Sequence, residues 1–286
     1  METITSISEL RKLLDGRRTT EQSIGLVPTM GNLHTGHLKL VKAATQSCSF
    51  VTTTIFVNPL QFGADEDITA YPRTLNEDQE KLIVAGCHCL FAPSVEEIYG
   101  SNPLTSTVIH VPGISELHCG KSRPGHFAGV ATMVSKLFNI VRPDRAFFGL
   151  KDYQQYLLIK QLVNDLVLEI EIIGIEIERE PDGLAMSSRN AYLTAEERKI
   201  APFLHACLND IAGAILNEDR DYRKLEKEGV KKLQEAGFKP EYFSICHAET
   251  LQPANSEDSS IVLMVAASLG ICRLIDNLRM QTSYPL

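Results

Sequence analysis

Two histidines three residues apart, His34 and His37, are the side chains whose types and spacing first indicate chemistry in this sequence. They follow an apolar run, residues 24–27, that is long enough for a buried strand, and an apolar spacing typical of a helix begins at Leu38. The pair therefore lies where a strand gives way to a helix. Free backbone N–H groups and the helix dipole favour an anion at such a point, so we expect both imidazoles to face a bound phosphate.

A polar cap is the competing interpretation of a histidine at a helix start. Two histidines among glycines, directly after a buried strand, make that interpretation weaker. The segment His34-Thr-Gly-His37 resembles the His-x-Gly-His motif of the nucleotidyl-transferase superfamily, which includes the class I aminoacyl-tRNA synthetases. That resemblance implies an enzyme that moves adenylyl groups from ATP.

The composition is that of a globular protein with an acidic balance. The chain has 286 residues, enough for one large domain or two ordinary ones, and 44% of them are hydrophobic. The net charge of −8 argues against a protein whose main task is to grip nucleic acid, because that task favours basic surfaces. We therefore expect no nucleic-acid partner.

Cysteine usage and hydropathy predict an intracellular protein without a membrane partner. Seven cysteines are scattered without a Cys-x-x-Cys pair, which is typical of a reduced, intracellular chain. We expect no protein metal site at Cys87-His88-Cys89, since strand alternation would point His88 away from its neighbours. Residues 1–10 lack the features of a signal peptide, and the longest apolar run, residues 261–267, is too short to span a bilayer.

Strands and helices are predicted to alternate through residues 1–176. Capping-box patterns at Ser6 and Thr74 predict helix starts, and Pro28 is expected to end the first strong strand. This alternation predicts an α/β fold built on a doubly wound parallel sheet. β-Branched and apolar runs predict its strands at residues 24–27, 50–57, 87–92, 107–111, 145–149 and 169–175.

The pattern changes near residue 177. A capping-box pattern at Thr194 predicts the start of a helical stretch at residues 195–216, and a second helical stretch is predicted at residues 222–236. Strands near 241–249, 260–267 and 270–276 follow, so the order no longer alternates. We therefore predict two domains, residues 1–176 and a smaller α+β domain of residues 177–286.

Polar residues follow two of the predicted strands. Asn58 and Gln61 come after the strand at residues 50–57, where parallel sheets bind ligands, although a plain Asn-Pro turn explains them equally well. Lys151, Asp152 and Gln155 stand at a helix start after the strand at residues 145–149. We expect Lys151 to meet phosphates and Asp152 to accept hydrogen bonds from ribose.

Three loops carry further charged or polar groups. Residues 120–129 are predicted to form a flexible loop that carries Lys121, Arg123 and His126. These cations suit a carboxylate or a phosphate, but a solvated loop without a ligand explains them equally well. Residues 65–67 are predicted to be a solvated acidic loop. Residues 186–189 offer two hydroxyls and a guanidinium, although such a loop is more often without function.

Six segments in combination resemble the pantoate–β-alanine ligase family, and the resemblance spans essentially the whole chain. They are Pro28-Thr-Met-Gly-Asn-Leu-His-Thr-Gly-His37, Phe56-Val-Asn-Pro-Leu-Gln-Phe-Gly63, Arg123-Pro-Gly-His-Phe127, Val141-Arg-Pro-Asp144, Gly149-Leu-Lys-Asp-Tyr-Gln-Gln155 and Gly183-Leu-Ala-Met-Ser-Ser-Arg-Asn190. The resemblance implies that pantoate, β-alanine and ATP give pantothenate, AMP and pyrophosphate through a pantoyl-adenylate, with Mg²⁺. It also implies a Rossmann-like N-terminal domain, a C-terminal lid and a cytoplasmic homodimer.

The resemblance implies roles for individual residues. Catalysis is implied for His37, as the leading proton donor, and for His34, Lys151 and Arg189. Gln61 and Gln155 are implied to bind pantoate, and Gln61 to lie near β-alanine as well. The implied ATP-binding residues are Met30, Gly31, Asn32, Leu33, His34, Thr35, Gly36, His37, Gly149, Leu150, Lys151, Asp152, Glu178, Met186, Ser187, Ser188 and Arg189. The Mg²⁺ ligands are expected to be mainly phosphate oxygens, with Asp78 as a candidate helper.

Three positions depart from the family pattern. Leu150 stands where the family usually has glutamate, and Glu178 stands where an apolar residue commonly meets adenine. Backbone contacts to the nucleotide would make both changes harmless. Ala128 replaces an arginine of some members, which weakens the case for extra phosphate contacts from that loop.

Other functions remain open from the sequence. An adenylyltransferase acting on a phosphate-bearing cofactor precursor fits the His-x-Gly-His pattern, although Gln61 and Gln155 suit a carboxylate- and hydroxyl-bearing substrate better. A tRNA-charging enzyme is disfavoured by the acidic charge and the lack of an anticodon-binding module. A nucleotide-binding regulator without chemistry would bind ATP and show no turnover.

Overall fold

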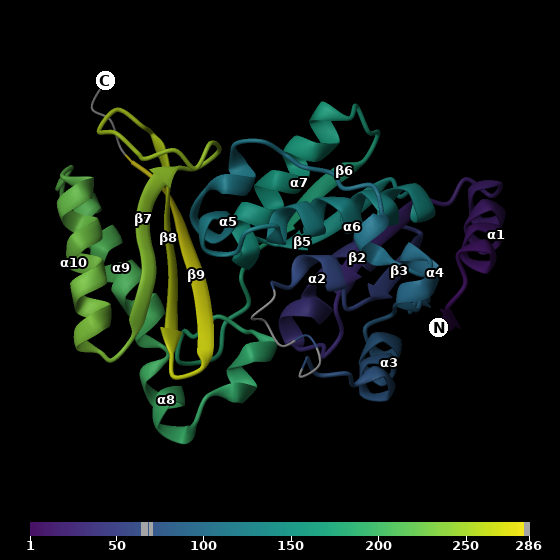
Figure 1. Cartoon of the computed structure of the whole chain (residues 1–286), viewed down its shortest axis with the longest axis horizontal. Helices are drawn as coiled ribbons and strands as arrows, with labels where there is room; N and C mark the ends of the chain where they lie inside the picture. Colours follow the sequence, from purple (N-terminus) through teal and green to yellow (C-terminus); the bar gives the residue numbers. More distant parts are fainter. Residues whose placement is uncertain (64–67, 69–70, 283–286) are drawn as a thin grey trace. The chain divides into compact units, whose positions relative to one another are not determined.

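The computed structural model of the chain describes residues 1–63, 68 and 71–282 (Figure 1). It divides into two compact units, and each is described by itself. Unit 1 comprises residues 1–116, 123–150 and 155–176, and unit 2 comprises residues 117–122, 151–154 and 177–286. The acidic loop predicted at residues 65–67 lies outside the described residues.

A parallel six-stranded sheet carries unit 1, with the strand order β1-β4-β3-β2-β5-β6. All its pairings are parallel, which confirms the predicted doubly wound α/β fold. The order reverses between β2 and β5, so the loops after these two strands flank the point where such sheets bind ligands. The strands are β1 (Glu2–Ile4), β2 (Ile24–Thr29), β3 (Phe50–Ile55), β4 (Cys89–Phe91), β5 (Arg145–Gly149) and β6 (Glu171–Ile175).

Helices and the sheet of unit 1 bury a common apolar core. Val27 on β2, Leu33 after it and Leu82 on α3 belong to one cluster of buried side chains, so the end of β2 is anchored to α3. The helices are α1 (Ile7–Arg18), α2 (Thr35–Ser47), α3 (Leu75–Val84), α4 (Val95–Tyr99), α6 (His126–Val141) and α7 (Tyr153–Asp165), of which residues 153 and 154 belong to unit 2.

Several local predictions in unit 1 are wrong. Residues 107–111 form no strand; instead the Ile109 N–H donates to Thr132 Oγ1 on α6 over 2.9 Å. Strand β2 continues through Pro28, whose missing N–H lies beyond the pairing of Gly25 and Leu26 with β5.

Helices α1 and α3 begin directly after Ser6 and Thr74, as predicted, but the predicted capping bonds are not formed. Neither Ser6 nor Thr74 caps its helix with its side chain, so both expected capping boxes are absent. The loop predicted at residues 120–129 is largely helical, because α5 (His118–Ser122) includes Lys121 and α6 begins at His126.

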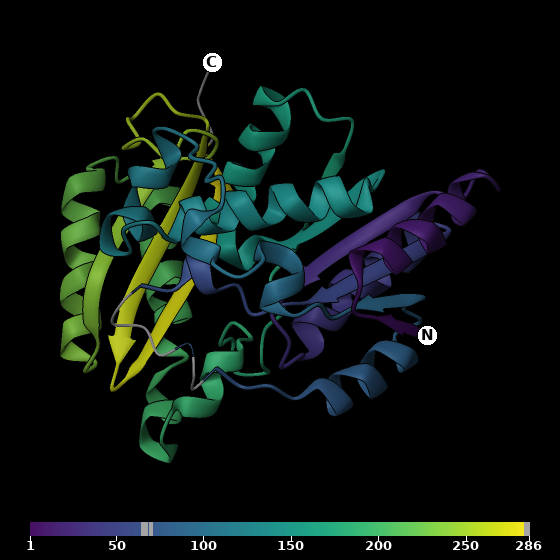
Figure 2. The same cartoon turned by 45° about the vertical axis from the view of Figure 1, so that its right-hand side comes forward.

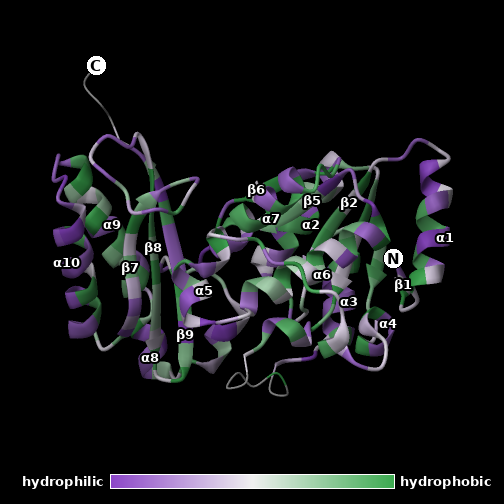
Figure 3. Ribbon diagram, turned by 45° about the horizontal axis from the view of Figure 1, so that its top comes forward, coloured by the Kyte–Doolittle hydropathy of each residue, from purple (hydrophilic) through white to green (hydrophobic). Residues whose placement is uncertain are grey.

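Unit 2 contains an antiparallel sheet of β7 (Lys239–His247), β8 (Ser260–Leu269) and β9 (Cys272–Gln281). Figures 1 and 2 show α9 (Phe203–Leu216) and α10 (Tyr222–Glu235) covering one face of this sheet. Along α10 apolar and charged residues alternate with helical spacing (Figure 3), and its buried residues Leu225 and Leu233 face the core. This small α+β arrangement agrees with the predicted fold class.

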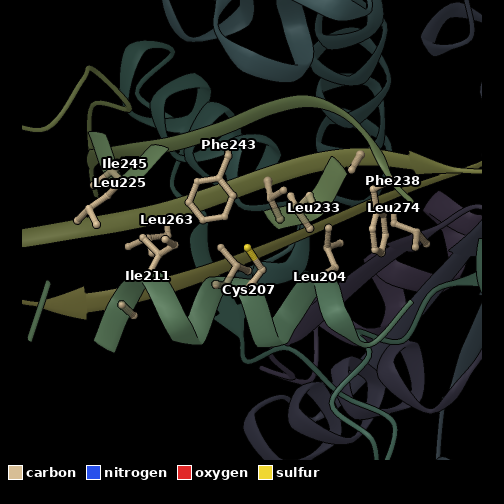
Figure 4. Packing of buried hydrophobic residues seen from close by; sticks show 14 of the residues in the cluster. Leu204, Cys207, Ile211, Leu225, Leu233, Phe238, Phe243, Ile245, Leu263 and Leu274 are labelled. Atoms are coloured by element: carbon tan, nitrogen blue, oxygen red, sulfur yellow. The ribbon is translucent and has the colours of Figure 1, made fainter. Parts of the chain in front are cut away.

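The core of unit 2 is apolar and continuous (Figure 4). Cys207 and Ile211 from α9, Leu225 from α10 and Phe243 and Leu263 from the sheet lie together in it. The helix predicted at residues 195–216 is divided into α8 (Ala195–Ile200) and α9, because Pro202 interrupts the helical hydrogen bonding. The capping box predicted at Thr194 is confirmed. The Thr194 hydroxyl accepts from the Glu197 N–H, and the Glu197 carboxylate accepts from the Thr194 N–H.

Candidate active site

The histidine pair lies at the first turn of α2 in unit 1. His34 is the N-cap: its Nδ1 accepts from the Gly36 N–H over 3.1 Å, and His37 Nδ1 accepts from the His34 N–H over 3.4 Å. The two rings lie side by side, with centroids 4.0 Å apart. Because both Nδ1 atoms accept, each neutral ring carries its hydrogen on Nε2. The cap interpretation is thus correct for Nδ1, and it makes Nε2–H the group of each ring that can donate to an anion.

The segment between β2 and α2 is turned sharply. Gly31 and Asn32 have φ values of 85° and 50°, a region in which glycine and asparagine are favoured over other residues. The Asn32 and Leu33 N–H groups both donate to Asp78 on α3. Sequence reasoning considered Asp78 only as a metal helper, and no local pattern links it to a segment 45 residues earlier.

Gln61 projects from a short 3-10 turn, η1 (Pro59–Gln61), after β3. Its Oε1 accepts from Asn58 Nδ2 over 3.0 Å, and its Nε2 donates to Met30 Sδ over 3.0 Å. The structure therefore brings together Gln61 and Met30, two of the predicted site residues.

Asn58 is buried and committed to the protein. Its Oδ1 accepts from the Leu60 N–H and the Tyr99 hydroxyl, and its Nδ2 donates to Gln61 and to the Gly129 carbonyl. These four bonds satisfy the whole amide. Of the two interpretations of Asn58, the turn is correct, and its further effect is to orient Gln61.

His126 joins α6 to the same turn. Arg123 Nη1 lies 2.9 Å from His126 Nε2, and since a guanidinium only donates, this nitrogen accepts. The hydrogen on Nδ1 then donates to the Gln61 carbonyl, 2.8 Å away. His126 thus serves as a neutral bridge rather than as the cation that the loop sequence suggested.

The carboxyl end of β5 carries the remaining predicted residues of unit 1. Gly149 ends the strand, Leu150 is buried, and Gln155 is half-buried on α7. A Cβ on Gly174 of β6 would meet Leu150 Cδ2 at 2.6 Å, so the Leu150 side chain packs against that strand. Leu150 therefore contributes packing to the sheet.

In unit 2, Lys151 lines a pocket. Asn277 Nδ2 donates to the Lys151 carbonyl over 3.0 Å and fixes its backbone. Ser187 and Asn190 line the pocket together with Lys151, while Asp152 is exposed at its surface position on η4 (Leu150–Asp152). The structure thus brings together Lys151 and Ser187 among the predicted residues.

The Met186–Arg189 loop is fastened to unit 2 through its backbone. The Met186 N–H donates to the Glu178 carbonyl over 2.9 Å, and Cys272 Sγ donates to the Arg189 carbonyl over 3.1 Å. Ser187 Oγ accepts from the Arg189 N–H as the cap of η5 (Ser188–Tyr192). The Glu178 carbonyl therefore holds this loop, and the backbone contact of Glu178 to the nucleotide stays a prediction.

A charged pair lies beside that loop. Arg179 donates two hydrogen bonds, of 2.7 and 2.9 Å, to the buried carboxylate of Asp276, and a third to the Gly183 carbonyl. Burial, reinforced by Arg179, lowers the pKa of His205, although Asp276 nearby raises it. Sequence reasoning missed this pair, because residues 97 positions apart show no local signal.

Comparison with known proteins gives one consistent family. A family model described as pantoate–β-alanine ligase matches residues 2–279. The chain is 54% identical to the pantothenate synthetase of Pseudomonas fluorescens Pf-5 over all of both chains. It resembles the crystal structure of pantothenate synthetase from Thermus thermophilus, with a TM-score of 0.91, 42% identity and coverage of 97% and 99%. A Francisella tularensis pantoate–β-alanine ligase, described as complexed with β-γ ATP and β-alanine, matches with a TM-score of 0.81, 36% identity and 97% coverage of each chain.

Proposed function

Since the chain belongs to the pantoate–β-alanine ligase family, we propose that it joins pantoate to β-alanine with ATP and releases pantothenate, AMP and pyrophosphate. It is a ligase that forms a C–N bond. The observation that carries the proposal is the 54% identity along the full length of a curated relative. The complex of the Francisella relative supports ATP and β-alanine as ligands.

The first step is proposed to form a pantoyl-adenylate. A pantoate carboxylate oxygen attacks the α-phosphorus of ATP, a P–O bond forms, and the bond to pyrophosphate breaks. Carboxylate and triphosphate are both anions, so the main demand on the protein is to neutralise negative charge.

In unit 1, the Nε2–H groups of His34 and His37 are proposed to bind phosphate oxygens, with His37 as the leading proton donor. Their Nδ1 contacts support this role, since they hold both rings in one tautomer before substrate arrives. Gln61 and Gln155 are proposed to hold pantoate in line with the phosphorus, and the fixed amide of Gln61 supplies the orientation that proximity requires.

In unit 2, Lys151 and Arg189 are proposed to bind phosphates, with Ser187 and Ser188 as further donors. The Met186–Arg189 backbone, held by Glu178 and Cys272, supports a preorganised loop. The remaining predicted contacts of the nucleotide run along residues 30–37 and 149–152.

In the second step the neutral amine of β-alanine is proposed to attack the acyl carbon of the adenylate. A C–N bond forms, the C–O bond to AMP breaks, and the nitrogen releases a proton to solvent. Water would hydrolyse the mixed anhydride. We therefore propose that the C-terminal domain, residues 177–286 with its Met186–Arg189 loop, excludes water from the intermediate.

Mg²⁺ is proposed to enter as a complex with ATP, in which it would screen the phosphate charge. Among the described residues, no group of three or more histidine, cysteine, aspartate or glutamate side chains is arranged to hold a metal ion. The Asp78 carboxylate is occupied by backbone N–H groups. We therefore propose that phosphate oxygens supply most of the Mg²⁺ ligands.

We also propose a cytoplasmic homodimer that works without nucleic-acid or membrane partners. No helix in the described part of the chain has the length and apolar character needed to cross a bilayer. Sedimentation equilibrium tests the dimer, since it would give twice the 31.7 kDa of the chain.

The mechanism is tested with pantoate carrying heavy oxygen in both carboxylate positions. We expect one labelled oxygen in AMP and one in the pantothenate carbonyl, in a reaction that depends on β-alanine for turnover. Labelled phosphate beside unlabelled ADP would establish an acyl-phosphate route and overturn the adenylate. AMP retained in the product would indicate an adenylyltransferase, and ATP binding without turnover would indicate a regulator.

A further inference from the structure

Asp78 is a fully buried carboxylate whose oxygens serve the turn before the histidines. It lies in the first turn of α3 and has no exposed surface. Its Oδ2 accepts from the Asn32 N–H over 2.8 Å, and its Oδ1 accepts from the Leu33 N–H over 2.7 Å. Two successive backbone donors thus converge on one side chain.

Lys81 on α3 and Thr74 just before it make further hydrogen bonds to the turn or to Asp78. Lys81 Nζ donates to the Leu33 carbonyl over 2.8 Å and lies 3.8 Å from Asp78 Oδ1. The Thr74 hydroxyl donates to Asp78 Oδ2 over 3.2 Å. Leu33 is therefore held at its N–H by Asp78 and at its carbonyl by Lys81, while its side chain is buried in the core.

The fit is close enough to require the local backbone shape. A Cβ on Gly31 would lie 3.2 Å from Asp78 Oδ2 and 3.0 Å from Ile55 Cγ2, in a backbone region that side chains rarely adopt. The held residues, 31–33, run directly into His34, which is the N-cap of α2. The direction of both imidazoles thus depends on this turn.

We propose that Asp78 is a positioning residue that sets the orientation of His34 and His37 toward the nucleotide phosphates, and that Lys81 assists it. The proposal rests on the proposed function of the histidines. It also accounts for the orientation of the carboxylate toward the backbone of residues 32 and 33. We refer to Asp78, Lys81 and the backbone of residues 31–33 as the α3 clamp.

The test compares Asp78→Asn with Glu77→Gln. Asparagine keeps the size of the side chain but has one acceptor oxygen and an added donor, so it cannot accept both N–H groups in the same way. Glu77 lies in the same helical turn and is exposed, so its replacement removes an equal charge without touching the clamp.

The readout is the nitrogen-15 spectrum of the histidines in the folded protein without substrate. Signals are assigned with single His34→Asn and His37→Asn variants. In the wild type and in Glu77→Gln we expect Nε2–H tautomers for both rings. In Asp78→Asn we expect mixed tautomers and about a 100-fold loss in kcat/KM, because small displacements of reacting groups have effects of that size.

A folded Asp78→Asn protein with wild-type histidine signals would overturn the proposal, even with reduced turnover. If Asp78→Asn fails to fold, Lys81→Met tests the clamp from the other side, with a smaller shift in the same signals as the supporting result and unchanged signals as the contrary one. The spectrum reports on the clamp without any reaction, so it separates failure of the clamp from failure of the proposed ligase activity.

Discussion

The side-chain amide of Asn58 holds that of Gln61: Asn58 Nδ2 donates to Gln61 Oε1 over 3.0 Å. This contact fixes which end of the Gln61 amide is available as a donor. The first prediction replaces Asn58 with aspartate, which puts a buried carboxylate against Gln61 Oε1. We expect the Gln61 amide to turn over and kcat/KM for pantoate to fall about 100-fold.

Asn102 provides the matched control for that variant. It precedes Pro103 and caps a short turn in the same way, with Leu104 N–H as donor, but it is exposed. Asn102→Asp should keep wild-type steady-state kinetics. Equal effects of the two substitutions would contradict the orienting role of Asn58.

The second prediction concerns the close approach of α6 and η1. A Cβ on Gly129 would lie 2.2 Å from the Leu60 carbonyl oxygen, so Gly129→Ala must push the turn that carries Gln61 away. We expect a loss of about 1–3 kcal/mol in the free energy of unfolding, measured by urea denaturation. Gly213→Ala, on α9 with nothing within 4 Å of its Cβ, should be neutral or stabilising. An unchanged free energy of unfolding for Gly129→Ala would contradict this prediction, because the backbone would then have moved without a loss of stability.

The third prediction is that His37→Ala lowers the rate of adenylate formation by about 10²–10³, the effect of losing one charge-stabilising donor. Rapid-quench measurement of AMP formation tests it. The fold should survive, since His37→Ala removes only the 3.4 Å bond from the His34 N–H and leaves the N-cap bond of His34 Nδ1 in place. Unchanged turnover in the folded variant would remove His37 from the mechanism.

Lys151→Ala forms the fourth prediction. A comparable loss is expected in adenylate formation, with little effect when preformed pantoyl-adenylate is supplied together with β-alanine. Lys160→Ala removes the same charge from an exposed position on α7 and should retain activity. A defect restricted to the second step would contradict the phosphate contact of Lys151.

The fifth prediction concerns pH. Burial lowers the pKa of His118 below its ordinary value of 6.5, partly offset by its bond to the Leu251 carbonyl and by Glu226. The unfolded chain therefore binds more protons than the folded one as pH falls through 6.5, and the free energy of unfolding decreases toward about pH 5. Burial also lowers the pKa of His88 and His205, which adds to this trend. Denaturation at several pH values should show a smaller slope for His118→Gln than for the wild type.

Much of the fold can be predicted from local patterns, because β-branched and apolar runs indicate strands such as residues 50–55 and 145–149. The histidine pair was also predictable, since its place between strand and helix is a property of neighbouring residues. Asp78 and Asn58 act on partners far along the chain, 45 residues away in one case and 71 in another. No periodicity records such contacts, so these residues become visible only after folding.

The wrong local predictions also arise because contacts between distant residues leave no pattern in the sequence. Residues 107–111 have the composition of a strand, but their backbone bonds a threonine side chain on α6 instead of another strand. Proline had opposite effects at two places: Pro28 lies within β2, whereas Pro202 separates α8 from α9. The interior of an α-helix needs the N–H that proline lacks for its hydrogen bonds. At the end of a strand this N–H is not needed on the side where no neighbouring strand pairs.

The chain passes between unit 1 and unit 2 five times, because residues 117–122 and 151–154 belong to unit 2 although unit 1 surrounds them in sequence. Neither unit is one uninterrupted piece of polypeptide. A gene fragment that ends at codon 176 would still encode α5 and η4 but not the residues they contact, such as Tyr242 and Asn277. A single recombination event therefore cannot exchange either unit intact between homologous enzymes, so the two must be inherited together.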